Sequence, residues 1–230
     1  MRALTLFLLA ALLWNCNSDS TTPEAGELST ELYTRLQEQL IMAKPGDVVE
    51  IPAGAYEFDR PLSLDGVSNV TLRGAGADET VLSFQFQKAG AEGLRITADS
   101  VTLEGFTVLD TKGDAIKLQD CNGITIRNVK TSWRGGADET NGGYGFYPVA
   151  SRDVLIENCE ASYASDAGIY VGQCTNVTVR NCYAHENVAG IEIENCTDAR
   201  VYGNRSENNT GGILVFDLPE LPAGHGKGCK

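Results

Sequence analysis

Short runs of alternating apolar and polar residues recur along most of the chain, and each run ends in asparagine or glycine. Alternation with a period of two predicts a β-strand with one buried face. Six runs share this pattern, at residues 69–74, 100–105, 123–128, 153–158, 176–181 and 198–203. In the last three, the first apolar positions are Val154, Val177 and Ala199, which lie 23 and 22 residues apart. The sequence therefore predicts a repeating unit of 22–23 residues.

A second predicted strand recurs in the same phase. Its inward apolar positions are Ile116, Phe146, Ile169, Ile191 and Ile213, with spacings of 30, 23, 22 and 22 residues. Both strands thus belong to one unit, and one spacing of 30 residues marks an insertion. A propeller blade would need roughly 40 residues, and the motif of leucine-rich repeats is absent. We therefore predict an all-β fold, a parallel β-helix built as a solenoid of 22–23-residue coils.

The segment 29–44 departs from the strand pattern. Leu32, Leu36 and Leu40 are spaced for one face of a helix, and Pro45 and Gly46 end it. We expect this helix to cap the N-terminal end of the solenoid. The domain 28–230 ends soon after a full repeat with no amphipathic cap, so we expect it to be incomplete at its C-terminus or covered by something else.

The first residues have the pattern of an export signal. Residues 4–14 form an apolar run of 11 residues after a short basic start, whereas a membrane-spanning helix needs about 20. We predict a signal peptide at 1–15 and a polar tether at 16–27. Cys16, directly after the apolar run, resembles the lipidated cysteine of bacterial lipoproteins; the alternative is an ordinary secretory signal. Both predict export, as an outer-membrane lipoprotein or a periplasmic or extracellular protein.

Charge narrows the possible partners. The 230 residues include 31 acidic and 18 basic side chains, a formal net charge of −13. This balance disfavours nucleic acid and anionic lipid, so membrane contact is expected only through a lipid anchor.

The cysteines follow the repeat. There is no Cys-x-x-Cys pair and no histidine at zinc-ligand spacing. Cys159 and Cys182 are 23 residues apart, and Cys174 and Cys196 are 22 apart, so each pair is predicted to stack in an inward column. We expect reduced thiols, with disulfides between stacked pairs as the alternative.

The cap helix, the segment GDVVEIPAGAYEF at 46–58 and the stacked motif NVTVRN at 176–181 resemble the right-handed parallel β-helix proteins of the pectate-lyase-like superfamily. Within it, the chain is similar to exported β-helix repeat proteins related to mannuronan epimerases. The resemblance covers roughly residues 32–215 and implies a lateral face that cleaves, epimerises or binds an acidic polysaccharide. The Asp-Pro-His-Asp motif of mannuronan epimerases and the double aspartate of polygalacturonases are absent from the sequence.

The residue after each inward position of the second strand is expected to face solvent, because side chains alternate along a strand. This column contains Lys117, Tyr147, Tyr170 and Glu192. Tyrosine rings offer apolar faces to a sugar, and a lysine pairs with a uronate carboxylate. The column is a predicted substrate-binding surface; the alternative is that the aromatic residues only stabilise the sheet.

A lyase or C5-epimerase needs a base for the C5 proton, an acid and a cation that neutralises the sugar carboxylate. His185 is the predicted base, Tyr163 the acid and Asp166 the residue that orients His185 or holds a cation. Arg134 or the lysine of the tyrosine column is the predicted neutraliser. The alternative for the histidine is a solvated side chain in a polar turn.

The insertion at 133–143 is expected to wall a groove over Tyr147 and Tyr170, since loops on a rigid scaffold often carry ligand contacts. The alternative for Trp133 is that it packs under its own loop.

Three hypotheses for function remain at this point. The first is an exported lyase or epimerase acting on a uronate-containing polysaccharide. The second is a glycan-binding surface lipoprotein without catalysis, and the third is a structural surface solenoid. No cofactor motif is present; calcium is the candidate cofactor, because it bridges a polyanion to an acidic protein. The sequence does not predict an oligomeric state.

Overall fold

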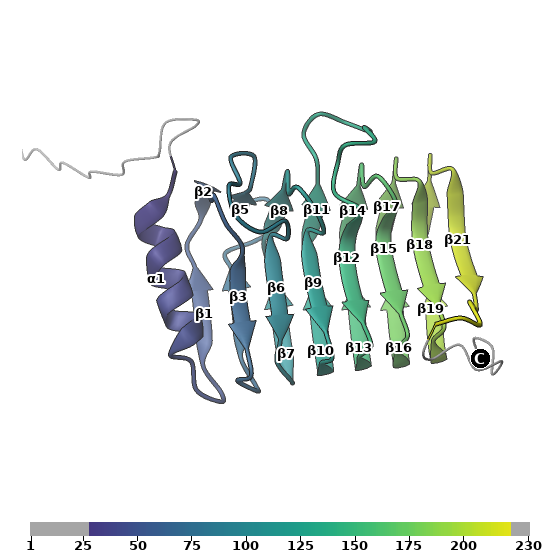
Figure 1. The fold of residues 1–230 in the computed structure, drawn as a ribbon, viewed down its shortest axis with the longest axis horizontal. Coiled ribbons are helices and arrows are strands. Elements are labelled where there is room, and N and C mark those ends of the chain that lie inside the picture. The colour runs from purple at the N-terminus through teal and green to yellow at the C-terminus, as the bar shows by residue number, and fades with distance from the viewer. Residues whose placement is uncertain (1–27, 222–230) are drawn as a thin grey trace, which may run out of the picture.

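The computed structural model describes residues 28–221, which form a parallel β-solenoid with one helix at its N-terminal end (Figure 1). The predicted all-β fold and N-terminal helix are confirmed. The predicted signal peptide, the tether, Cys16 and residues 222–230 lie outside the described residues. No helix within residues 28–221 is long and apolar enough to cross a membrane.

Each coil contributes one strand to each of three parallel sheets. Sheet 1 contains β1 (Val48–Ile51), β4 (Thr71–Gly74), β7 (Val101–Glu104), β10 (Asn122–Arg127), β13 (Arg152–Glu157), β16 (Thr175–Arg180) and β19 (Thr197–Tyr202). Sheet 2 contains β2 (Gly54–Glu57), β5 (Thr80–Ser83), β8 (Thr107–Leu109), β11 (Lys130–Ser132), β14 (Glu160–Ser162), β17 (Tyr183–His185) and β20 (Arg205–Glu207). Sheet 3 contains β3 (Leu62–Asp65), β6 (Leu94–Thr97), β9 (Ile116–Gln119), β12 (Tyr144–Val149), β15 (Ala167–Gly172), β18 (Ala189–Glu194) and β21 (Gly211–Phe216).

The strand register follows the sequence repeat. In sheet 1, Val154 pairs with Val177 of the next coil, and in sheet 3, Ile169 pairs with Ile191. Equivalent apolar residues therefore stack into continuous inward columns, and they form the single large core of the solenoid.

Asparagines make the sharp turn between sheets 1 and 2. Asn128, Asn158 and Asn181 have φ values of 53°, 53° and 55°, which is the left-handed region. Asparagine tolerates this conformation better than most residues that carry a Cβ atom. The recurrent asparagine thus keeps the turn short and lets the next coil stack in register.

The cysteines of the described residues are buried and free, as predicted: Cys121, Cys159, Cys174, Cys182 and Cys196. Their thiols lie near main-chain carbonyls of the preceding coil; for example, Sγ of Cys182 is 3.7 Å from the carbonyl oxygen of Ile156. Burial raises the pKa of the Cys159 thiol, so it stays protonated in the core. These side chains act as small hydrophobic residues of the inward columns.

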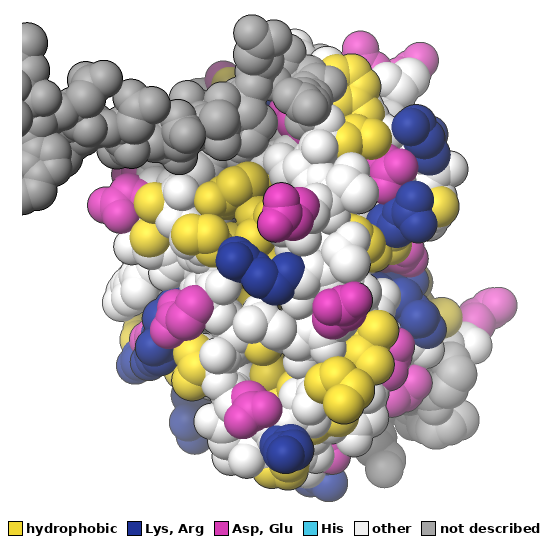
Figure 2. Space-filling view, turned by 90° about the vertical axis from the view of Figure 1, so that its left-hand side faces the viewer, with side chains coloured by type: hydrophobic (Ala, Val, Ile, Leu, Met, Phe, Trp, Pro, Cys, Tyr) yellow, Lys and Arg dark blue, Asp and Glu magenta, His cyan; other side chains and the backbone are white. Residues whose placement is uncertain are grey.

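The helix α1 (Thr30–Ile41) covers the first coil with Leu36 and Leu40, which are both buried. The Gln37 side chain accepts a hydrogen bond from the backbone N–H of Ser63 on β3 and donates one to the carbonyl of Ser63. Both bonds satisfy backbone groups at the edge of the first strand of sheet 3. Seen end on, this capped end mixes acidic, basic and apolar side chains (Figure 2). At the other end, the inward-column residues Ile213 and Val215 of β21 are 46% and 59% exposed.

Charged side chains alternate in sign along part of the outer face of sheet 1. Glu104 accepts hydrogen bonds from Arg73 of the preceding coil and Arg127 of the next coil. Two coils further on, Arg180 pairs with Glu157. Because equivalent positions of adjacent strands lie about 4.8 Å apart, like charges there would repel, and alternation makes the neighbours attractive.

Glu104→Gln is expected to lower the free energy of unfolding by about 1 kcal/mol at pH 7, because it removes the shared partner of two arginines. The two arginines hold the pKa of the Glu104 carboxyl below its usual range, so its stabilisation is lost as the pH falls through that pKa. The difference in the free energy of unfolding between the variant and the natural protein should therefore be smaller in acid. Urea unfolding at pH 7 and pH 3 measures it.

Glu50→Gln is the matched control, since the Glu50 side chain is 60% exposed and contacts only Arg73 among the described residues. An equal loss in both variants at pH 7 would contradict the assignment of Glu104 as the central carboxylate of this ladder.

Candidate functional site

Sheet 3 carries the predicted tyrosine column on its outer face. Tyr147 of β12 lies opposite Lys117 of β9, and Tyr170 of β15 lies opposite Glu192 of β18. A third tyrosine, Tyr144, joins them, with ring centroids 4.6 Å from Tyr147 and 4.7 Å from Tyr170. We call Tyr144, Tyr147 and Tyr170 the tyrosine cluster.

Tyr144 was not predicted on this face, because strict alternation places it on the inner face, like Phe146. The signal that alternation breaks here is the glycine before each inward position from Phe146 onward. A Cβ atom at Gly145 would clash with the carbonyl of Gly168, and one at Gly168 would lie 2.6 Å from the amide nitrogen of Asn187. The backbone is therefore packed inward at the glycine, and the residue before it is free to face outward.

The three rings differ in accessibility. Tyr170 is only 6% exposed, whereas Tyr144 and Tyr147 are half-buried and pack over it. The hydroxyl of Tyr170 donates a hydrogen bond to Glu194 at 2.9 Å. The accessible part of the cluster is therefore formed by Tyr144 and Tyr147, with Tyr170 as their support.

The pKa values of Tyr170 and Tyr144 are raised, mainly by burial and to a smaller extent by a neighbouring carboxylate. The carboxylate is Glu194 for Tyr170 and Asp166 for Tyr144. Both hydroxyls therefore remain protonated at neutral pH and act as hydrogen-bond donors. Asp166, predicted as a partner of His185, is placed beside Tyr144 instead.

The same face is rich in carboxylates. Burial raises the pKa of Asp114 to about 6, against the opposing effect of Lys117. Burial also raises the pKa of Glu192, with further contributions from Asp166 and Glu194. The Lys117 Nζ atom lies 3.8 Å from Asp114 and 4.9 Å from the Tyr147 ring centroid, so the lysine bridges an acid and an aromatic ring.

His185 lies on β17 of sheet 2, whereas the tyrosine cluster lies on sheet 3. Its ring stacks on Tyr183 with centroids 4.3 Å apart. Its Nε2 atom is 3.4 Å from Glu160, and its Nδ1 atom is 3.4 Å from Glu186. A carboxylate thus faces each ring nitrogen.

Tyr163 lies beside this histidine, with ring centroids 6.0 Å apart. The two residues were predicted in one column, but Ser162 is the register partner of His185. The connection from β14 to β15 is one residue longer than that from β17 to β18, which displaces Tyr163 into the turn. A hydrogen bond with Glu186 raises the pKa of Tyr163, so a chain of contacts runs from Tyr163 through Glu186 to His185.

The insertion forms a long loop between β11 and β12 that projects from the solenoid (Figure 1). Trp133 is 4% exposed at its base, and its indole N–H donates to the carbonyl of Thr111 at 2.8 Å. Near the end of the loop, the Asn141 side-chain amide donates a hydrogen bond to the carbonyl of Tyr163 at 2.7 Å. The indole therefore packs under its own loop, which is anchored at both ends.

The loop walls a hollow of about 610 Å³ over the turns that follow sheet 2. Its lining includes Asp138 and Glu139 of the loop and Tyr163, Ser165 and Glu186 of the turns. The loop therefore borders the Tyr163–Glu186 contact, and the hollow that it walls includes neither Tyr147 nor Tyr170, contrary to the prediction.

Arg134 reaches back toward the N-terminal coils. It forms hydrogen bonds with Asp110, Ser83 and Gln85, and its guanidinium is 3.5 Å from Glu57. The structure thus places Arg134 along sheet 2, where acidic and polar side chains already occupy it. Among residues 28–221, no group of three or more histidine, cysteine, aspartate or glutamate side chains is arranged to hold a metal ion.

Comparison with curated proteins finds the pre-neck appendage proteins of Bacillus phages phi29 and PZA. Each is 26% identical over 216 aligned positions, which cover 78% of this chain and 25% of the phage protein. The chain therefore spans about a quarter of the length of these relatives.

Two solved structures share the fold. The N-terminal fragment of bacteriophage phi29 gene product 12 superimposes with a TM-score of 0.54 at 20% identity, covering 67% of this chain and 32% of the fragment. An alginate lyase from Paenibacillus sp. str. FPU-7 superimposes with a TM-score of 0.57 at 16% identity, covering 83% of this chain and 80% of the lyase. The family model described as right handed beta helix region matches residues 68–222, and this chain belongs to that family.

Proposed function

We propose that this protein is an exported β-helix that binds a polysaccharide on the tyrosine cluster of sheet 3. The observation that carries the proposal is the packing of Tyr144 and Tyr147 over a buried Tyr170, within a ring of carboxylates. Export rests on the predicted signal, and Cys16 is the proposed lipid anchor.

The cluster suits a sugar for two physical reasons. Aromatic rings present apolar surface to the C–H faces of a pyranose, and here the rings are pre-organised by mutual packing, so binding orders few side chains. Carboxylates such as Asp166 and Glu192 accept hydrogen bonds from sugar hydroxyls, while the protonated phenols donate them.

The finer proposal is that the polymer contains uronates. Lys117 is the cation beside Tyr147, with Arg95 of the preceding coil as its register partner, and it lies 3.8 Å from Asp114. When Asp114 takes up a proton, Lys117 becomes available to pair with a sugar carboxylate. The alternative is a structural surface solenoid, which the phage appendage relatives favour.

Tyr147→Ala is expected to weaken polysaccharide binding about tenfold, which corresponds to roughly 1.4 kcal/mol, because it removes an accessible ring of the cluster. Affinity electrophoresis in gels containing alginate, polygalacturonate or a neutral glucan measures the change. Tyr147→Phe keeps the ring and should retain most of the affinity.

Tyr56→Ala is the matched control, since Tyr56 lies on β2 of sheet 2. If the folded natural protein binds none of the polymers, or both alanine variants bind equally well, the tyrosine cluster is not a polysaccharide site.

Asp114→Asn is expected to raise the free energy of unfolding by about 2–3 kcal/mol at pH 8. Asp114 has a pKa of about 6 in the folded protein, above its ordinary value, so the folded state binds more protons than the unfolded state between about pH 4 and 6. The contribution of Asp114 to the stability of the natural protein is therefore lost as the pH rises through this window, and the variant lacks this loss. A site retained at a cost in stability is typical of a binding group.

Urea unfolding of both proteins at pH 4 and pH 8 measures this difference, with the exposed Asp198→Asn as control. Equal stability of Asp114→Asn and the natural protein at both pH values would contradict the buried, unfavourably charged state assigned to Asp114.

A second candidate function is uronate lyase or C5-epimerase activity at His185. The observation in its favour is the contact chain from Tyr163 through Glu186 to His185, beside a hollow walled by the inserted loop. In this mechanism His185 accepts the C5 proton and Tyr163 protonates the leaving oxygen in the lyase reaction. Lys117 and Arg134 contact Asp114 and Asp110, so a sugar carboxylate at His185 needs another cation, and calcium is proposed.

His185→Gln is expected to abolish both unsaturated-product formation and C5 proton exchange, because glutamine lacks a titratable nitrogen. The assays use alginate and polygalacturonate, with and without calcium, and follow ultraviolet absorbance and deuterium incorporation. Tyr183→Phe serves as control, since it keeps the ring that stacks on His185. Silence of the folded natural protein in both assays leaves binding without catalysis as the function.

A further inference from the structure

We infer that the outer face of sheet 1 is a second binding site, a trough that holds a linear uronate polymer along the solenoid axis with its carboxylate on Arg200. This site is separate from the tyrosine cluster, which belongs to sheet 3, and so goes beyond the proposed function. We call it the threonine trough.

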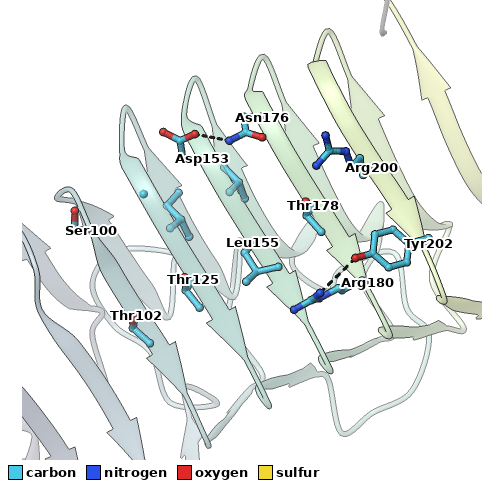
Figure 3. A pocket seen from close by; sticks show the side chains of 13 residues that line it. Ser100, Thr102, Thr125, Asp153, Leu155, Asn176, Thr178, Arg180, Arg200 and Tyr202 are labelled. Carbon is cyan, nitrogen blue, oxygen red and sulfur yellow. Dashed lines mark hydrogen bonds between the residues drawn. The ribbon is translucent and has the colours of Figure 1, made fainter.

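The floor of the trough is one register row across five strands (Figure 3). The row contains Thr102 of β7, Thr125 of β10, Leu155 of β13, Thr178 of β16 and Arg200 of β19. Four of these five side chains are short or apolar, and all are at least partly exposed. The floor is therefore low, and hydroxyl groups line most of its length.

Longer or raised side chains border the floor on both sides (Figure 3). On one side, Asp153 of β13 and Asn176 of β16 have left-handed φ values, and the Asn176 amide donates a hydrogen bond to Asp153 at 2.6 Å. On the other side, Arg180 extends beside Tyr202 and donates to its hydroxyl at 3.3 Å. The space between the two borders is about 590 Å³.

Arg200 supplies the charge that selects an anion. Arg180 pairs with Glu157, as Arg127 pairs with Glu104 in an earlier coil. Arg200, in contrast, has no ion pair or side-chain hydrogen bond to any residue within 28–221 and is exposed. A guanidinium that is not neutralised and lies at the end of a polar floor offers a planar, bidentate site for a carboxylate.

The spacing of the row favours a polymer of sugars over a compact anion. Successive floor residues repeat every ~4.8 Å, so β7 to β19 spans about 19 Å. A chain of pyranose units laid across the strands presents a hydroxyl to each threonine, which both donates and accepts hydrogen bonds. Leu155 at the middle contacts an apolar C–H face. The trough therefore fits a polymer that combines hydroxyl groups with at least one carboxylate.

The test measures polygalacturonate binding by isothermal titration calorimetry in the Tyr147→Ala background, which weakens binding at the tyrosine cluster. Adding Arg200→Gln is expected to weaken the remaining affinity about tenfold and to reduce its dependence on salt. Adding Thr178→Val, which is close in shape but lacks the hydroxyl, is expected to weaken it about threefold. Thermal unfolding confirms that each variant stays folded.

Arg152→Gln is the matched control, because Arg152 is also exposed and on sheet 1 but does not line the trough. Polyglutamate tests whether charge alone is sufficient. The inference is overturned if Arg152→Gln weakens binding as much as Arg200→Gln, if polyglutamate binds as tightly as polygalacturonate, or if no binding remains in the Tyr147→Ala background. None of these outcomes bears on the tyrosine cluster, which is tested by Tyr147→Ala alone.

Discussion

The in-register stacking of parallel coils is the constraint on which the rest of this structure depends. Every residue of a coil lies about one strand spacing from its equivalent in the next coil, so each position must be compatible with copies of itself. Apolar residues satisfy this condition inside, where Val154 stacks on Val177. On the outer face of sheet 1, charged residues satisfy it by alternation of sign, as Arg73, Glu104 and Arg127 do. The conformation of Asn158 and Asn181 at the turns meets the same requirement for the backbone.

The candidate sites occur where the repeat is interrupted. The tyrosine cluster follows the inserted loop, and Tyr163 leaves its column because its turn contains one residue more than the next. In the threonine trough the interruption is electrostatic, since Arg200 occupies the row of the threonines and forms no ion pair with any residue within 28–221. Departures from a repeat that otherwise stabilises itself need another explanation, and ligand contact is the one proposed for each of these places.

The period of the sequence was sufficient to predict the strands of sheets 1 and 3, the inward columns, the N-terminal helix and the outward facing of Lys117, Tyr147 and Glu192. These features depend only on spacing, and spacing is visible in one sequence. Tyr170 lies on the predicted outer face but is buried beneath Tyr144 and Tyr147 and does not face solvent. Tyr144, the contacts of Arg134 and the pairing of Asp166 with that tyrosine were not predicted, because they depend on turn lengths and on side chains that cross between coils. Gly145 was the available signal for Tyr144, since a glycine directly before an inward position marks a backbone that a Cβ atom would obstruct.

Each sheet presents a different part of the 22–23-residue unit, so the three outer faces vary independently. A substitution at Tyr147 changes the outer surface of sheet 3 and leaves the register of Thr178 and Arg200 on sheet 1 unaltered. The strand register of both sheets is set by the inward apolar columns, which face away from these residues. An acidic protein can therefore carry an anion-selective trough on one face while carboxylates surround a tyrosine cluster on another. The net charge of −13 describes the whole chain, and the local sign is set by which row a cation occupies and whether the next coil neutralises it.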